Sequence, residues 1–186
     1  MSVKITDGFA PGDDEKVISI LSKWTGGYLS DRLFIKLAGI TPQAGIVVII
    51  FRQNQKGEIE VLLVPRPDND PLWPEMLNLP GKMFRAADYN RKDDLPVNGP
   101  LERIQKDELK IKFSKEPEFV GVSLHKDDRG PLVVLVYLSE VDNNLELPKG
   151  RMWCSINNLE KVNNLVQTEL IPINIALNYY QNKLKT

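Results

Sequence analysis

One run of apolar residues constrains the fold of this chain more than any other feature. Residues Ala44–Phe51 read Ala-Gly-Ile-Val-Val-Ile-Ile-Phe, which is rich in β-branched side chains and too short for a good helix. Such a run is typical of a buried strand. The turn Asn54–Gly57 and the alternating segment Glu58–Val64 follow, and together they predict a hairpin. The fold must therefore be built around a sheet with a buried strand.

Helical patterns lie before and after this hairpin. Apolar residues recur at helical spacing after Asp13 and after Ser30, a good N-cap, and these patterns predict a helical extension over residues 1–40. Residues 41–186 form the main domain. The remaining elements are expected as helices over Pro100–Ile111, capped by Asn98 or Gly99, and Pro172–Lys185, and as strands over Glu118–His125, Leu132–Leu138 and Arg151–Ser155. This order predicts an α/β fold, a mixed sheet with helices on its faces, whose extension packs on the domain or builds a homodimer.

Composition removes several classes of function. The chain has 24 basic and 25 acidic residues, so no overall field attracts nucleic acid or an anionic membrane. Its longest apolar runs are far shorter than a membrane span needs. One Cys and one His exclude disulfides, multi-cysteine zinc sites and paired-histidine metal sites. We therefore expect a cytoplasmic protein with no nucleic-acid or membrane partner, whose chemistry relies on carboxylates and hard cations.

One constellation of residues indicates such chemistry. Arg66 follows a predicted strand, Leu79-Pro80-Gly81 ends a loop, and the next predicted helix carries Arg103 and ends in Asp107-Glu108-Leu109. This arrangement resembles the conserved box of the Nudix hydrolase superfamily over roughly Thr41 to Val162. The resemblance implies a Nudix-like α/β/α sandwich with a mixed sheet. It also implies a hydrolase whose small-molecule substrate is a nucleoside diphosphate linked to another moiety.

The box is degenerate in this chain. Ile104 stands where the box has a Glu, Gln105 replaces an aliphatic residue, and Lys110 replaces the second Gly. Gly81 and Arg103 lie 22 positions apart, eight more than in the box, so the segment between them contains an insertion. These changes remove ligands that a complete box would supply.

A subgroup of the superfamily has a related change. The GDP-mannose mannosyl hydrolases also have an apolar residue after the box Arg, and they are similar to the run Glu102–Leu109 and to the loop Pro67–Pro74 here. In that subgroup a Glu at the position of Glu108 and a backbone carbonyl at the position of Gly81 hold Mg²⁺. The resemblance therefore implies Mg²⁺ at these residues, with Mn²⁺ as the alternative.

The helix geometry limits this metal site. Ile104 lies one turn before Glu108 on the same face, where a Glu would have been a second ligand. Asp107 points about 100° away on a regular helix, so it reaches the metal only through water or a distorted turn. Arg103 is expected to position the helix by pairing with a carboxylate. A site with so few carboxylates should hold one metal ion weakly.

Further candidates lie in loops. Arg66 and Arg85 either bind phosphate or are ordinary surface charges. Trp73 either stacks on a base or sugar or covers the core. The subgroup's base is a His in the loop before a late Trp, and that loop has no His here, so the candidate bases are Glu146 and His125.

Two hypotheses follow from these residues. The first is a Mg²⁺-dependent Nudix-type hydrolase that uses Glu108, the Gly81 carbonyl and Asp107. The second is a Nudix-fold nucleotide-binding or regulatory module that no longer hydrolyses, motivated by Ile104 and by the insertion over 82–98. In a structure soaked with Mg²⁺, a metal beside Glu108 and Gly81 would favour the enzyme, and an empty groove blocked by a lysine would favour the module.

Overall fold

The structure is a computed structural model that describes residues 13–23, 30–90, 95–141 and 147–184. Its helices and strands follow one another in an order close to the expected one. They are α1 (Asp13–Leu21), α2 (Asp31–Ile40), β1 (Gln43–Gln53), β2 (Ile59–Pro65), β3 (Leu77–Asn78), β4 (Gly81–Met83), η1 (Ala86–Asn90), α3 (Asn98–Arg103), η2 (Ile104–Leu109), β5 (Glu118–Asp127), β6 (Gly130–Ser139), β7 (Met152–Ser155), η3 (Ile156–Lys161), η4 (Gln167–Glu169) and α4 (Leu170–Lys183).

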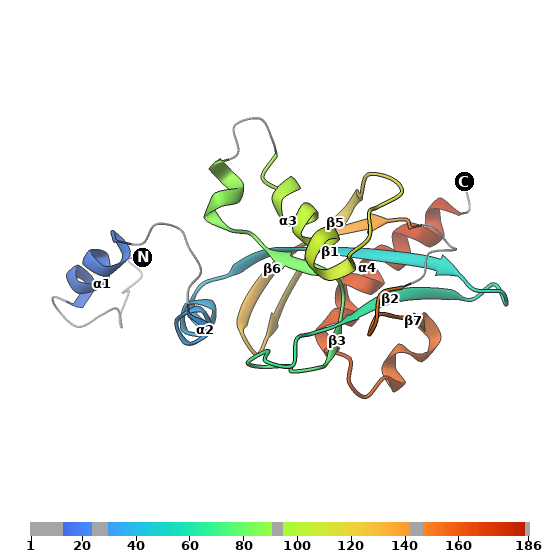
Figure 1. The fold of residues 1–186 in the computed structure, drawn as a ribbon, viewed down its shortest axis with the longest axis horizontal. Helices are drawn as coiled ribbons and strands as arrows, with labels where there is room; N and C mark the ends of the chain where they lie inside the picture. The colour runs from blue at the N-terminus through green and yellow to red at the C-terminus, as the bar shows by residue number, and fades with distance from the viewer. Residues whose placement is uncertain (1–12, 24–29, 91–94, 142–146, 185–186) are drawn as a thin grey trace, which may run out of the picture.

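The strands form one mixed sheet around β1 (Figure 1). The main strand order is β3-β2-β1-β6-β5, in which β1 and β6 are parallel and the other neighbours are antiparallel. On its other edge β1 changes partner along its length: Gly45–Val47 pair with β4, whereas Phe51–Gln53 pair with β2. Strands β4 and β2 therefore pair with different halves of β1, and they separate near its middle.

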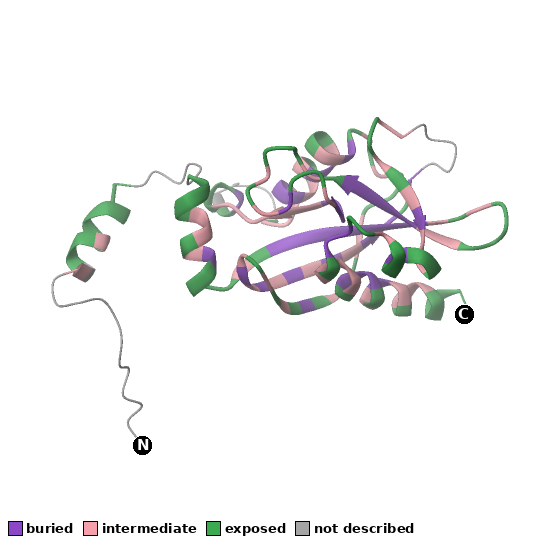
Figure 2. Cartoon of the chain, turned by 90° about the horizontal axis from the view of Figure 1, so that it is seen from below, coloured by how far each residue is buried: buried purple, intermediate pink, exposed green. Residues whose placement is uncertain are grey.

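Alternation along β1 explains the layers. Ile46, Val48 and Ile50 face one core, which contains residues of η2, and the intervening Val47, Ile49 and Phe51 face a second core, which contains residues of α4. A strand covered on both faces must be apolar where it is buried, and the buried positions 45–51 of β1 are all apolar (Figure 2). The expected mixed sheet with helices on both faces is confirmed.

The segments between Gly81 and Leu109 differ from expectation. The expected irregular stretch 82–98 contains strand β4 and the 3-10 helix η1 among its described residues. The next helix begins at Asn98 with Val97 as N-cap, not with Asn98 or Gly99 as the cap. It also does not continue as a regular α-helix, because residues Ile104–Leu109 form a π-helix.

Helix α2 lies beside the β5–β6 hairpin (Figure 1). Ser30 caps α2 by accepting the N–H of Leu33, as its position predicts. Gly130 opens β6 against α2, where a Cβ would lie 2.0 Å from the carbonyl oxygen of Ala38. Beyond α2, α1 lies apart from the sheet (Figure 1). Among the described helices, none is both long and apolar enough to span a membrane.

Candidate functional site

Beside the middle of β1, the structure brings together two of the three predicted metal-binding residues, Gly81 and Glu108. Gly81 begins β4, and its N–H donates to Oε2 of Glu108 at 2.7 Å. The ammonium of the neighbouring Lys82 donates to Oε1 of the same carboxylate, also at 2.7 Å. Both oxygens of Glu108 therefore have a partner from β4.

The π-helix places Glu108 at this position. Ile104 and Leu109 are both fully buried although they are five residues apart, a spacing that brings two side chains to one face in a π-helix better than in an α-helix. Lys110 then ends the helix in a left-handed conformation, with φ of 58°. The guanidinium of Arg151, just before β7, donates to the main-chain carbonyl of Glu108. The turn that carries Glu108 is thus held from both sides.

The environment of Glu108 is mostly buried. Burial raises the pKa of Glu108 above its usual value, and the charge of Lys82, the N–H of Gly81 and the charge of Arg66 oppose this rise. The side chains of Lys82 and Glu108 are 24% and 20% exposed. The pair is therefore shielded, but it still opens to solvent.

Arg66 and Trp73 lie on a second side of the site. Arg66 is fixed by Asp70, whose Oδ2 accepts from Nε at 2.9 Å and from the terminal guanidinium nitrogen at 2.5 Å. Trp73 is buried, and the guanidinium groups of Arg66 and Arg129 lie 5.1 and 4.8 Å from its ring centroid. Its Nε1 donates to Asp128. The Trp73 ring therefore holds two arginines in place.

Glu169 is a carboxyl group of this site that sequence reasoning missed. It ends η4, just before α4, and it interacts electrostatically with Arg129, Arg66, Asp127 and Glu108. Burial raises its pKa to about 7, while the two arginines oppose the rise. In the sequence Glu169 is only an acidic residue before a predicted helix. No sequence signal indicates that it lies close enough to interact with Glu108.

Asp88 is a second residue that the sequence did not reveal. It is buried and pairs with Arg103, with oxygen–nitrogen distances of 2.5 and 3.0 Å. Burial alone would raise the pKa of Asp88, but the guanidinium of Arg103 and the N–H of Arg85 hold it below its usual value. Arg103 also donates to the carbonyl of Met83. Arg103 thus has the expected helix-positioning role.

Three of the other predicted site residues, Asp107, Arg85 and His125, lie in the described part of the chain. Asp107 is exposed, and the main chain of Arg85 belongs to the turn around Asp88. His125 shares a hydrogen bond of 2.9 Å with Ser123, and burial lowers the pKa of His125. Glu146, the late-loop candidate, lies outside the described residues.

These residues do not fit a divalent cation at Glu108. Mg²⁺ needs about six oxygen ligands in near-octahedral geometry, usually including one or two carboxylates. Here an ammonium and an N–H occupy the Glu108 oxygens, and the preceding turn presents the buried Ile104. Over the part of the chain that the structure describes, no three His, Cys, Asp or Glu side chains gather as a metal site.

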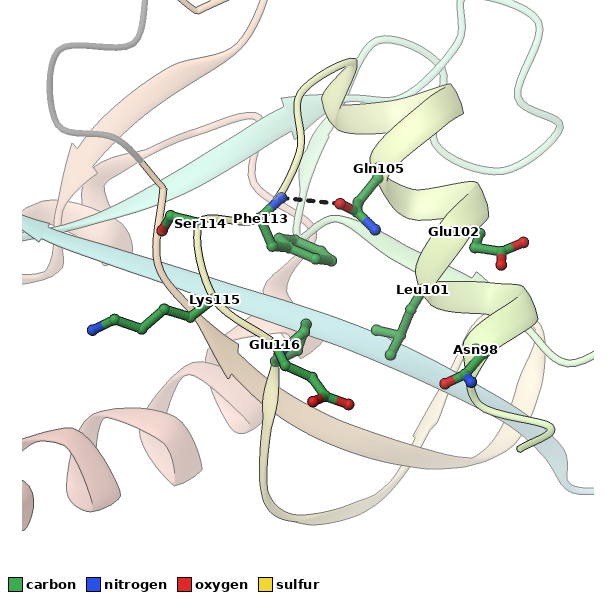
Figure 3. Close-up of a pocket in the computed structure, with 9 residues that line it drawn as sticks. Asn98, Leu101, Glu102, Gln105, Phe113, Ser114, Lys115 and Glu116 are labelled. Carbon is green, nitrogen blue, oxygen red and sulfur yellow. Dashed lines mark hydrogen bonds between the residues drawn. The ribbon is translucent and has the colours of Figure 1, made fainter. Parts of the chain in front are cut away.

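Two cavities are found in the described part of the domain. The larger, about 470 Å³, lies beside the arginines and is lined by Trp73, Met76, residues 126–128 and residues 165–168. The smaller, about 350 Å³, lies between α3 and the segment before β5 (Figure 3). There Gln105 accepts the N–H of Phe113 at 2.9 Å, which gives a structural role to a residue that departs from the box. The larger cavity is therefore the one that adjoins the charged groups.

Comparisons with known proteins agree with this architecture. Neither protein-family models nor curated protein sequences match the chain. Among solved structures, the NUDIX domain of Shewanella oneidensis NrtR, complexed with ADP ribose, is similar with a TM-score of 0.58 and 16% identity over 82% of this chain and 99% of that one. The C-terminal domain of mouse MUTYH, in complex with human PCNA, is similar with a TM-score of 0.57 and 14% identity over 76% of this chain and 91% of that one.

A named hydrolase is also similar. The Ap4A hydrolase of C. elegans gives a TM-score of 0.54 and 12% identity over 75% of this chain and 99% of that one. At such identities the likeness concerns the fold. The chain therefore has the fold of the Nudix hydrolases, as the resemblance of its degenerate box predicted.

Proposed function

We propose that this chain is a Nudix-fold module that binds a nucleoside diphosphate derivative and does not hydrolyse it with a metal at Glu108. The observation that carries the proposal is the 2.7 Å contact between the Lys82 ammonium and the Glu108 carboxylate. A lysine ammonium at this carboxylate competes with a metal ion for the same oxygens, and this supports the module. Ile104 supports the same function, because it supplies no oxygen ligand.

The cations around the groove support an anionic ligand. Arg66 and Arg129 are each fixed by an aspartate, and an arginine fixed on one side keeps its remaining N–H groups aligned for an anion. The cavity of about 470 Å³ beside them has room for the rest of a nucleotide. The NUDIX domain of NrtR, which shares this fold, is known in complex with ADP ribose.

Calorimetric titration tests the proposal. We expect ADP-ribose or a related nucleoside diphosphate to bind the full chain with the same affinity in Mg²⁺ and in EDTA. Incubation with nucleotide sugars, dinucleotides and nucleoside triphosphates should give no product. Mg²⁺-dependent product formation by the wild type that Glu108→Gln abolishes would refute the proposal.

A second candidate is hydrolysis of the same class of compound, and Glu169 is the observation that favours it. A carboxyl group with a pKa of about 7 can accept a proton from an attacking water near neutral pH. This candidate predicts turnover in the same panel that Glu169→Gln lowers while ligand affinity is retained. Equal turnover in the wild type and in Glu169→Gln would show that Glu169 has no role in this hydrolysis.

A further inference from the structure

Lys82 contacts the carboxylate at which the resemblance to the Nudix box implied a metal ion. Its ammonium lies on the Glu108 carboxylate, beside the N–H of Gly81. We propose that Lys82 is a built-in cation that binds an anionic phosphate group of the ligand in place of a divalent metal. This inference deepens the proposed function and rests on it.

The geometry leaves the ammonium able to bind an anion. A lysine ammonium has three N–H donors, and one of them is directed to Oε1 of Glu108. The Lys82 side chain is 24% exposed, so part of it contacts solvent. Glu108 fixes the ammonium without removing its remaining donors. A phosphate oxygen can therefore complete its hydrogen bonds.

The surroundings favour a fixed lysine over an exchangeable metal. Ile104 is 0% exposed and belongs to the core beneath the site, so a carboxylate at that position would have to be buried. The main-chain contact of Arg151 holds the turn of Glu108 without any metal. Arg66 adds the next positive charge, close enough to act on Glu108. The Lys82 ammonium and these neighbouring groups therefore hold the Glu108 carboxylate without a metal ion.

A merely structural ion pair is the competing interpretation. In that case, removing the Lys82 charge would lower stability and leave ligand affinity unchanged. If Lys82 binds phosphate, removing its charge weakens ligand binding in folded protein and lowers the salt dependence of that binding. Affinity and salt dependence therefore distinguish the two interpretations.

The first experiment measures ligand affinity. ADP-ribose and inorganic pyrophosphate are titrated into the wild type, Lys82→Met and the exposed-lysine control Lys106→Met, in EDTA and in Mg²⁺. We expect roughly a 10- to 100-fold loss of affinity in Lys82→Met only, because a hydrogen bond to a charged group is lost. The thermal unfolding of each variant is recorded alongside. Wild-type affinity in folded Lys82→Met would overturn the inference while leaving the proposed function standing.

The second experiment needs no organic ligand. Mn²⁺ binding to the wild type and to Glu108→Gln is followed by water proton relaxation. Equal Mn²⁺ binding by the wild type and Glu108→Gln would support the inference that Lys82, and not a metal ion, occupies the Glu108 carboxylate. Mn²⁺ binding that is lost in Glu108→Gln would overturn it. If the wild type binds neither ADP-ribose nor pyrophosphate, the phosphate contact falls together with the proposed function, and the Mn²⁺ titration still decides whether Glu108 holds a metal.

Discussion

Desolvation raises the pKa of the Glu169 carboxyl group to about 7, and the charges of Asp127 and Glu108 add to this rise. Its pKa is about 7 in the folded chain, against an ordinary value of 4.5. Below the ordinary pKa both states are protonated, whereas above it only the folded chain holds the proton. The stability that this proton contributes is therefore complete at low pH and is lost as the pH rises through about 7.

Glu169→Gln should remove this pH dependence. We expect the free energy of unfolding, measured by urea denaturation from about pH 5 to about pH 8, to fall less steeply in Glu169→Gln than in the wild type. Glu116→Gln, at an exposed position, serves as the control and should keep the wild-type slope. Equal slopes in all three proteins would contradict the burial of the Glu169 carboxyl group.

Asp88→Ala should destabilise the fold strongly. Asp88 and Arg103 are 4% and 17% exposed, so the substitution leaves a buried guanidinium without its carboxylate. We expect a loss of roughly 3–5 kcal/mol in the free energy of unfolding, measured by urea denaturation. The control is Asp107→Ala, an exposed acid of the following turn, which should change stability by only about 0.5 kcal/mol. Similar losses in both variants would show that the buried pair is not responsible.

At the scale of the element, the π-helix η2 explains one departure from the box. Lys110, which replaces the second Gly of the box, ends η2 with φ of 58°, a left-handed conformation that favours glycine. The chain thus keeps a left-handed backbone conformation at position 110 although the residue there is a lysine and not a glycine. The shape of the turn is set by the burial of Ile104 and Leu109.

Lys110→Gly should therefore stabilise the chain. We expect a gain of roughly 0.5–1 kcal/mol, since relief of the left-handed strain outweighs the extra freedom of glycine in the unfolded chain. The comparison is Lys106→Gly inside η2, which should lose about 1 kcal/mol. Chemical denaturation of both variants measures the difference. A loss in Lys110→Gly as large as that in Lys106→Gly would be the contrary result.

Elements with local signals could be predicted from the sequence, and elements set by tertiary contacts could not. The apolar run at β1 and the Ser30 cap of α2 predict their structures, because burial on both faces and N-capping depend on nearby residues. The π-helix could not be predicted, because its spacing depends on the core beneath it. The 3-10 helix η1 contains Asp88, whose side chain pairs with Arg103, 15 positions away in the sequence.

At the scale of the whole molecule, the same distinction applies to the site. Glu108 and Gly81 could be chosen from the sequence because they resemble positions of the box, and Arg66 and Trp73 because they lie at or in the loop before it. Glu169 could not, because it comes to the site from near the far end of the chain. The expected cytoplasmic location and the expected lack of a nucleic-acid partner stay predictions.

The N-terminal extension belongs to the same scale, because some of its apolar side chains are exposed. Ile18 and Ile20 on α1 are 60% and 65% exposed, and burying such side chains between two chains would stabilise a dimer. The homodimer expected from the sequence therefore stays our prediction. Light scattering of the wild type should give twice the chain mass of 21.1 kDa.

Replacing both Ile18 and Ile20 by Ser should convert that dimer to a monomer. The control is Leu124→Ser, because Leu124 is a comparably exposed apolar residue, 72% exposed, on the edge strand β5. It should stay dimeric, since β5 lies outside the extension. A monomeric wild type, or a dimer that Leu124→Ser disrupts and the α1 double variant does not, would assign the extension another role.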